Sequence, residues 1–285
     1  MRTIQQPGPA EPERIQWIEA RGRKLTLDLK PGLLLDAIAE AFAAEGFSSG
    51  VLRLPAGSTL APFAYVMPAL STTPEHAAFY SETFRPDGIT RIDTGALTFG
   101  ERDGAPFFHG HALWREADGR HNGGHILPDQ SVLAEPISVD AIGLDGAGFV
   151  AGHDPETNFK LFMPAERPSG GNADVGGRFF VLRLRPNRDV FTALEAFCAE
   201  RGIAHAVIHG GVGSTIGARF ADGRSIEPFA TEIAITAGHV APGADGKPEA
   251  ALAIALVDYT GGMAEGPLQR GDNSVLMTLE LVLEA

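Results

Sequence analysis

The chain has 285 residues, of which 44% are hydrophobic and 21% charged, and its formal net charge at pH 7 is −13. This length accommodates two domains of roughly 100–150 residues, each with its own hydrophobic core. Nucleic-acid binders neutralise phosphates with clustered Lys and Arg, so a chain with 23 such residues against 36 Asp and Glu is not expected to bind nucleic acid.

Apolar runs of about 18 residues, the length that a membrane-spanning helix needs, do not occur in the sequence. The N-terminal segment also lacks the apolar core of a secretory signal. Cys198 is the only cysteine, so no disulfide can form within the chain. We therefore expect a cytoplasmic protein without a membrane segment, in which Cys198 is a buried structural thiol.

The first predicted unit follows an N-terminal arm, residues 1–20, that is rich in Pro, Glu and Gln. A strand at 24–29 leads into a helix at 33–45, where apolar side chains recur at helical spacing, and Gly46 ends that helix. Further strands are predicted at 50–54, 89–99, 105–114, around 125–127, and at 136–144, with turns rich in Gly, Asp and Pro between them.

Two histidines of the predicted strand 105–114 stand two positions apart, so His109 and His111 project from the same face. The segment 117–120, Ala-Asp-Gly-Arg, has the turn chemistry of a β-hairpin, which would bring His125 back beside them. Neutral imidazoles suit zinc or another divalent transition metal. Three of them leave a fourth position open for water or substrate.

The segment from 146 to 177 is dense in Gly, Pro and polar residues and predicts an interdomain linker, although residues 159–163 are apolar enough to pack across a domain surface. A second unit follows with the same order of elements as the first. It consists of a strand at 179–184, a helix at 190–201, and strands at 204–209, 232–240, 250–257 and 275–283.

Several segments of the second unit repeat segments of the first in the same order. The matched pairs are 27–31 (LDLKP) with 182–186 (LRLRP), 40–45 (EAFAAE) with 195–200 (EAFCAE), 57–60 (GSTL) with 213–216 (GSTI), and 103–106 (DGAP) with 245–248 (DGKP). Agreement at separated points in one order indicates a tandem duplication.

The candidate ligands were not duplicated with the fold. Counting from the paired Asp-Gly-x-Pro turns, Ala251 and Ala253 occupy the slots of His109 and His111, and residues 261–266 replace the Gly-Gly-His segment. Methyl groups cannot ligate a metal. We therefore expect one ion per chain, in the first unit.

These elements predict an α+β fold of two tandem domains, each a mainly antiparallel sheet packed with one principal helix. The predicted divisions are an N-terminal arm (1–20), a first domain with the His metal site (21–145), a linker (146–177) and a second domain with a degenerate metal site (178–285).

The His-x-His strand, the Gly-containing hairpin and the Gly-Gly-His-Ile-Leu segment resemble the plant-and-prokaryote-conserved (PPC) domain. The strand–Pro–helix opening at 25–45 resembles it as well, so the likeness covers residues 22–145. Family members are typically trimeric, which implies a homotrimer of six domains. Plant members carry an AT-hook and prokaryotic relatives are often labelled DNA-binding by analogy, but this chain contains no Arg-Gly-Arg-Pro segment.

The resemblance also singles out Glu232, which matches the Glu of the family's Phe-Glu-Ile strand, whereas the first domain has Ile89 in that slot and Glu82 nearby. If pockets form where domains of the trimer meet, Glu232 would face the metal of a neighbouring domain and act as general base, with Glu82 as the other candidate. The alternative is that Glu232 pairs with Arg219 or Arg224.

The leading interpretation is a cytoplasmic metal-binding PPC-domain protein that acts on, or senses, a small molecule at its three-His site. As an enzyme it would be a metal-dependent hydrolase or lyase. The alternative is a non-enzymatic regulator that binds DNA or a protein partner and uses the metal as a structural brace. An exchangeable position on the metal beside an open pocket favours the enzyme, and a closed site with four protein ligands favours the regulator.

Overall fold

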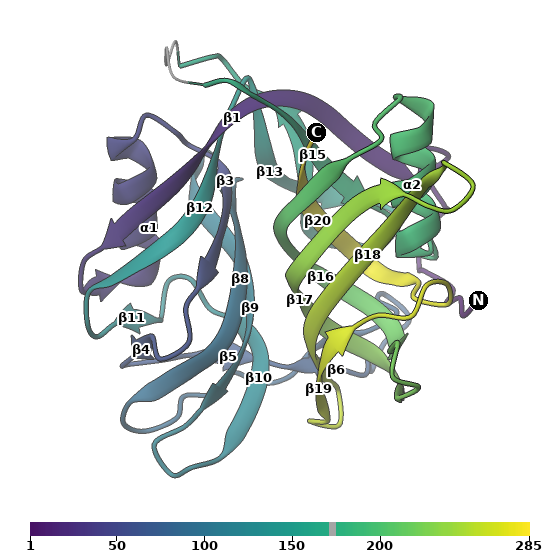
Figure 1. The fold of residues 1–285 in the computed structure, drawn as a ribbon. Coiled ribbons are helices and arrows are strands. Elements are labelled where there is room, and N and C mark those ends of the chain that lie inside the picture. Colours follow the sequence, from purple (N-terminus) through teal and green to yellow (C-terminus); the bar gives the residue numbers. More distant parts are fainter. Residues whose placement is uncertain (171–174) are drawn as a thin grey trace.

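The computed structural model describes residues 1–170 and 175–285. Two twisted sheets face each other, and each carries one helix on its outer side (Figure 1). The first half contains β1 (Ile15–Leu29), β2 (Gly32–Leu33), α1 (Leu34–Ala44), β3 (Gly50–Leu54), β4 (Thr59–Leu60), β5 (Tyr65–Val66), β6 (Pro68–Ala69), β7 (Phe79–Tyr80), β8 (Thr90–Arg102), β9 (Ala105–Arg115), β10 (His121–Ile126), β11 (Val132–Leu133) and β12 (Ile137–Asp145).

The second half repeats this arrangement after an extra hairpin. Its elements are β13 (Ala147–Asp154), β14 (Phe159–Glu166), β15 (Gly177–Leu184), α2 (Val190–Glu200), β16 (Ala206–Arg219), β17 (Ser225–Pro242), β18 (Pro248–Asp258), β19 (Met263–Pro267) and β20 (Val275–Glu284).

The same strand order occurs in both halves. The first sheet runs β1–β12–β3–β8–β9–β10, and the second runs β15–β20–β16–β17–β18–β19, with antiparallel pairing throughout. In each half, the strand that comes first in the sequence pairs with the strand that comes last, which are β1 with β12 and β15 with β20. The other strands of the sheet then follow in sequence order. The predicted α+β fold of two tandem domains is confirmed.

Strand β1 belongs to both sheets. Residues 21–29 pair with β12, while residues 15–22 pair with β15. The end of the predicted arm is therefore a strand that joins the two sheets. The preceding residues lie against the second domain, where the backbone N–H of Arg2 donates to Asp272 over 2.8 Å and the Gln6 amide donates to the Leu276 carbonyl over 2.7 Å.

The predicted linker contains a regular hairpin. Strands β13 and β14 pair from Ala147 with Glu166 to Asp154 with Phe159, and β13 runs parallel to the end of β8. Gly and Pro content favoured a linker, but the apolar residues between them, Phe149 and Phe162, are buried in a cluster shared by both sheets. Residues 171–174, also within the predicted linker, lie outside the described residues.

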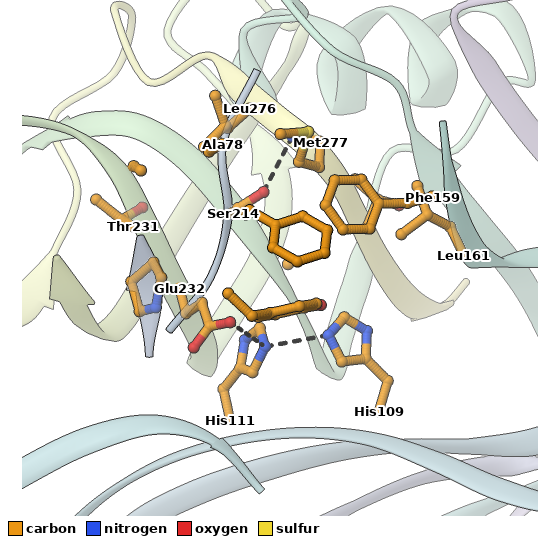
Figure 2. Close-up of a pocket in the computed structure, with 16 residues that line it drawn as sticks. Ala78, His109, His111, Phe159, Leu161, Ser214, Thr231, Glu232, Leu276 and Met277 are labelled. Carbon is orange, nitrogen blue, oxygen red and sulfur yellow. Dashed lines mark hydrogen bonds and ion pairs between the residues drawn. The ribbon is translucent and has the colours of Figure 1, made fainter. Parts of the chain in front are cut away.

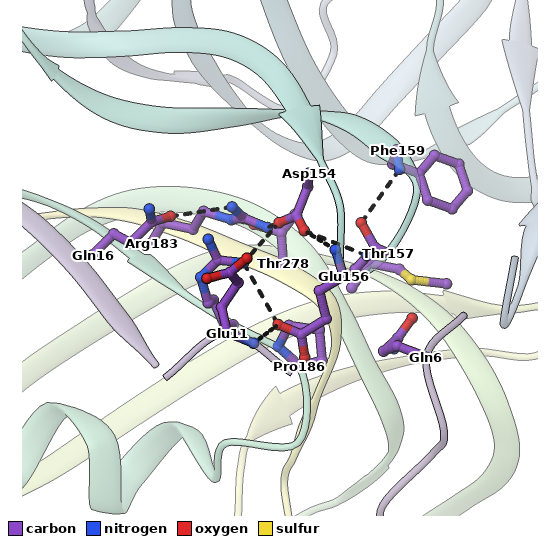
Figure 3. Close-up of polar contacts among 12 residues, drawn as sticks. Gln6, Glu11, Gln16, Asp154, Glu156, Thr157, Phe159, Arg183, Pro186 and Thr278 are labelled. Atoms are coloured by element: carbon purple, nitrogen blue, oxygen red, sulfur yellow. Dashed lines mark hydrogen bonds and ion pairs between the residues drawn. The ribbon is translucent and has the colours of Figure 1, made fainter. Parts of the chain in front are cut away.

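A buried ion network holds the tip of this hairpin against the second domain (Figure 3). Asp154 accepts hydrogen bonds from Arg183 and, over 3.0 Å, from Arg185. Asp154 and Arg183 are both fully buried. Arg183 also donates to the Thr278 hydroxyl over 3.1 Å. The network fixes the turn that leads into Phe159.

The helices follow the predicted stripes. Leu34, Ile38 and Phe42 of α1 are fully buried, and α2 buries an equivalent stripe that includes Cys198. Asp189 caps α2 by accepting from the Thr192 N–H over 3.0 Å, an interaction worth about 1 kcal/mol. Within residues 1–170 and 175–285, neither helix has the length and apolar character required to cross a membrane.

Small side chains let the two sheets approach each other. Ala96 of β8 packs on Val212 of β16 and Ala234 of β17, and Leu113 of β9 packs on Ala255 of β18. Because so little side-chain volume separates the sheets there, polar groups of the second domain can reach side chains on β9.

Candidate metal centre

The three histidines singled out by the sequence lie together on one face of the first sheet. His109 and His111 alternate with buried apolar positions along β9, and His125 of β10 lies directly opposite His111 in the antiparallel register. Each ring offers one nitrogen, and these nitrogens lie within 4.8 Å of one another. The i, i+2 spacing and the hairpin therefore produce the convergence expected from the sequence.

The hairpin turn depends on Asp118 and Gly119. The Asp118 carboxylate accepts from the Arg120 N–H over 3.0 Å, and Gly119 has a φ of +88°, a left-handed conformation that favours glycine. This turn sets the register that places His125 opposite His111.

Hydrogen-bond acceptors beside His109 and His111 define which ring nitrogen carries the hydrogen. His109 Nδ1 donates to the Glu280 carboxylate over 3.0 Å, and His111 Nδ1 donates to the Ile233 carbonyl over 3.0 Å. Each neutral ring then carries a lone pair on Nε2. The two Nε2 atoms face each other at 3.0 Å. Two nitrogen ligands of one tetrahedral zinc ion lie about 3.3 Å apart, so this donor pair fits such an ion.

His125 completes the donor set. Its Nδ1 is buried and has no hydrogen-bond partner within the described chain. Its ring packs edge to face against Tyr80, with the ring centroids 5.3 Å apart. A buried imidazole nitrogen without a partner is costly, and a metal ion is one group that would satisfy it.

The environment keeps the rings of His111 and His125 neutral. Burial lowers the pKa of His111 well below its ordinary value, and the neighbouring His109 and His125 lower it further, against the Ile233 carbonyl, which raises it. The pKa of His125 is also held well below its ordinary value, first by burial, then by His109 and by the positive charge of Arg102. Neutral imidazole is the form that ligates a metal.

Glu232 reaches this cluster from β17 of the second domain (Figure 2). Its Oε1 lies 3.7 Å from Nε2 of His111, and its Oε2 is buried without a hydrogen-bond partner in the described residues. Burial raises the pKa of Glu232 well above its ordinary value. The first-domain face that Glu232 meets belongs to the same chain, so this contact needs no neighbouring subunit.

The structure shows where the two predicted general bases, Glu232 and Glu82, lie relative to the histidines. Pairing of Glu232 with Arg219 or Arg224 is wrong, because Arg219 pairs with Glu227 over 2.8 Å and Arg224 pairs with Asp222 over 2.7 Å. Glu82 is exposed and is not among the residues that line the cavities beside the histidines. Of the two predicted bases, the site contains Glu232 alone.

A small cavity of about 50 Å³ adjoins His109, His111 and Glu232. Its far walls are mostly apolar, with Phe159 and Leu276 among them (Figure 2). This volume is enough for a few water molecules or for a small group of a ligand. A second cavity, of about 750 Å³, meets the first at His109 and also touches His125.

Two residues of the site, Glu280 and Tyr80, were not predicted from the sequence. Glu280, the partner of His109, is fully buried, and its position between Leu279 and Leu281 in an apolar strand is a signal that could have been used. Tyr80 faces His125 from the short strand β7, where no periodic pattern marks it. Burial raises its pKa, and the nearby Glu232 and Glu280 add to the shift.

The second domain offers no equivalent cluster. Among the described residues, the three histidines form the one group of His, Cys, Asp or Glu side chains able to hold a metal. Ala251 is exposed and Ala253 half-buried on β18, so the slots matched to His109 and His111 carry only methyl groups.

Several solved structures resemble about half of this chain. Curated proteins gave no match. Among solved structures, a PPC protein of Pyrococcus horikoshii is 17% identical, with 53% of this chain and 96% of that chain covered and a TM-score of 0.40. A metal-containing protein of Archaeoglobus fulgidus is 20% identical, with 52% and 97% covered and a TM-score of 0.38. A Salmonella enterica protein is 14% identical, with 52% and 96% covered and a TM-score of 0.37.

The family comparison is more specific. Residues 171–285 match the model of the Plants and Prokaryotes Conserved (PCC) domain, the family called PPC above. The match falls on the second half, and the repeated strand order extends the same architecture to the first half. Residues 171–285 are therefore similar to the Plants and Prokaryotes Conserved domain family, and the first half of the chain repeats the strand order of this matched half.

Proposed function

We propose that the chain binds one divalent transition-metal ion, zinc in the first place, through His109, His111 and His125, and acts there on a small molecule as a hydrolase or lyase. The observation that carries the proposal is the 3.0 Å approach of the Nε2 atoms of His109 and His111. The Nδ1 hydrogens of both rings are committed to acceptors, so two lone pairs face each other. A cation held between them replaces that repulsion with two bonds.

The protein's own groups have distinct roles in this proposal. When bound, the ion supplies a Lewis acid that polarises a carbonyl or water oxygen. We assign Glu232 the role of general base, because its carboxylate lies 3.7 Å from the Nε2 of His111 and borders the small cavity. Apolar side chains, Leu276 and Met277 among them, limit the water in that cavity and so strengthen electrostatic interactions there.

Metal content is the first test. Untagged protein, stripped with a chelator and reloaded with zinc, should contain one equivalent per chain by elemental analysis. His109→Ala and His125→Ala should each remove most of it. His205→Ala is the matched control, because that histidine is exposed and distant in sequence from the cluster. Two equivalents per chain, or none after loading, would contradict the proposal.

The second candidate is a regulator in which the metal only braces the site. The same 3.7 Å distance favours it, because Glu232 could be a fourth ligand and close the coordination sphere. Substitution of zinc by cobalt separates the two. Azide should change the visible spectrum if one position is exchangeable, and should leave it unchanged if four protein groups fill the sphere.

Glu232→Gln gives an independent readout. If Glu232 is a base and not a ligand, the variant should keep the wild-type affinity for the ion. If Glu232 is a ligand, the affinity should fall by more than about tenfold. In the second case, a protein partner of the regulator is the better proposal, since the charge of −13 disfavours DNA.

We further propose that the chain assembles as a homotrimer, as the PPC resemblance implies. Closed cyclic symmetry is the usual outcome of self-association. Light scattering should then give about 90 kDa, three times the 30.1 kDa of one chain. A mass of one chain would contradict this assembly but would leave the metal site, which lies within a single chain, unaffected.

A further inference from the structure

The larger cavity beside the histidines has the dimensions of a small-molecule site. Its volume of about 750 Å³ lies within the range of roughly 300–1,000 Å³ that ligand pockets occupy. Much of its wall is aromatic, from Phe79, Phe107 and Phe162, and His109 and His125 are also part of the lining. A ligand in this cavity can therefore rest an apolar body on the aromatic wall and present a reacting group to the imidazoles.

The charges on this wall are few. Arg102 and Lys160 are the basic residues, and Asp129, which is exposed to solvent, is the one acidic residue of the lining. The charge of Lys160 is already neutralised by Asp103, because the lysine ammonium group donates to both carboxylate oxygens, over 2.8 and 2.9 Å. Arg102 is therefore the cation of the cavity with the most capacity for a ligand.

Arg102 is held in a position suited to binding an anion. Its guanidinium lies over the Phe107 ring, 5.1 Å from the centroid, and the end of β8 that carries it is braced by β13. Among the described residues, Asp103 is the one carboxylate within 4.0 Å of this guanidinium, and the closest approach, from Nε to Oδ2, is 3.8 Å, which is too long for a hydrogen bond. The Nη groups can then donate to a ligand.

We propose that the molecule bound here is a small carboxylate with an aromatic or apolar body, whose carboxylate pairs with Arg102. This inference names the substrate class of the proposed metal site and rests on that proposed function. A planar guanidinium matches the two oxygens of a carboxylate. Phosphate groups usually engage several donors, such as backbone N–H groups at a helix N-terminus. Helix α1 reaches this cavity with Leu35 of its first turn, so binding of phenyl phosphate is the competing outcome that the test must exclude.

Calorimetry with the metal-free protein at low salt and pH 7.5 tests the inference. Removal of the ion matters because a metal would itself bind a carboxylate. The probes are benzoate, its neutral isostere benzamide, and phenyl phosphate. Benzoate should bind more tightly than benzamide. Arg102→Gln should weaken benzoate by at least about tenfold, the effect of one charge-assisted hydrogen bond, and should leave benzamide unchanged.

Matched variants control for charge and folding. Arg115→Gln also removes one positive charge, but from a residue of β9 that lies outside the cavity. It should have no effect on the affinity for benzoate. Lys160→Gln should have less effect than Arg102→Gln, because Asp103 already neutralises that lysine. Arg102→Lys, which keeps the charge, should retain part of the affinity. Thermal melts establish that each variant is folded.

Several outcomes would overturn the inference. These are equal binding of benzoate and benzamide, no loss in folded Arg102→Gln, no binding of benzoate at all, or tighter binding of phenyl phosphate than of benzoate. Zinc titration of the same samples distinguishes failure of the metal-site proposal from failure of the carboxylate proposal. Wild-type protein that binds zinc but not benzoate contradicts only the carboxylate assignment, and protein that binds benzoate through Arg102 but not zinc contradicts only the metal centre.

Discussion

Glu280, on the last strand of the second domain, accepts a hydrogen bond from Nδ1 of His109 in the first domain over 3.0 Å. The carboxylate is fully buried, so this contact is shielded from water. Outer carboxylates of this kind orient a ligating imidazole and raise its basicity. The second domain has no histidine cluster of its own among the described residues, yet it supports the cluster of the first.

Glu280→Gln should therefore weaken zinc binding by roughly 10–100-fold, because the amide can still accept from His109 but carries no charge. Competition with a chromogenic chelator measures the affinity. Glu284→Gln is the matched control on the same strand, since Glu284 pairs with His209 and Lys24 and not with the cluster. Equal affinities of Glu280→Gln and wild type would exclude this supporting role.

Local parts of the site could be predicted from the sequence, and distant contacts could not. His109, His111 and His125 are joined by one hairpin, so alternation along a strand and an Asp-Gly turn suffice to bring them together. Glu280 and Ile233 lie 171 and 122 positions away from their histidine partners. Their contacts depend on how two sheets pack, which periodicity does not specify.

The fold likewise has parts that could be predicted from the sequence and parts that could not. The helix predicted at 33–45 is observed at Leu34–Ala44, and the strand predicted at 50–54 is observed at Gly50–Leu54. The segment predicted as a linker contains the hairpin of β13 and β14, in which Phe149 lies opposite Pro164, and its Gly and Pro content does not reveal this pairing. Residues 159–163 do pack across a surface, and Phe159 forms part of the small cavity.

DNA binding should be absent at physiological salt. The chain has 23 basic and 36 acidic residues, and counterion release from a few contacts gives little affinity. Fluorescence anisotropy with AT-rich and mixed-sequence duplexes measures this directly. Submicromolar binding with a steep salt dependence would show that the basic residues are clustered more effectively than their number suggests.

The Cys198 thiol should be inert in the folded protein. It is fully buried on α2, and burial raises its pKa to about 11, with a smaller opposing effect of Arg201. An unfolded thiol has a pKa of about 8.5, so at pH 8 the folded protein holds far less of the reactive thiolate. Ellman's reagent should react slowly with native protein and rapidly in guanidinium chloride. Fast labelling of native protein would mean that α2 opens readily.

The buried pair of Asp154 and Arg183 should make stability depend on pH in acid. Burial raises the pKa of Asp154, but Arg183 and Arg185 lower it by more, so that the folded-state pKa lies below the ordinary value. A depressed carboxylate pKa contributes stability that is fully present above the unfolded pKa of about 3.9 and is lost as pH falls through the lower folded pKa. Asp154 should therefore stabilise the chain fully at pH 7.

Asp154→Asn should destabilise the chain by about 3–5 kcal/mol at pH 7, because it leaves the buried Arg183 guanidinium without its carboxylate. Asp103→Asn is the control, since Asp103 forms a solvent-exposed pair with Lys160 and its loss should have little effect on stability. Urea unfolding from pH 7 to pH 2 measures both. The gap between wild type and Asp154→Asn should narrow only below about pH 4, because Asp154 is protonated first in the unfolded chain and, at still lower pH, in the folded one. A gap that stays constant down to pH 2 would mean that the Asp154 charge is not what holds the hairpin to the second domain.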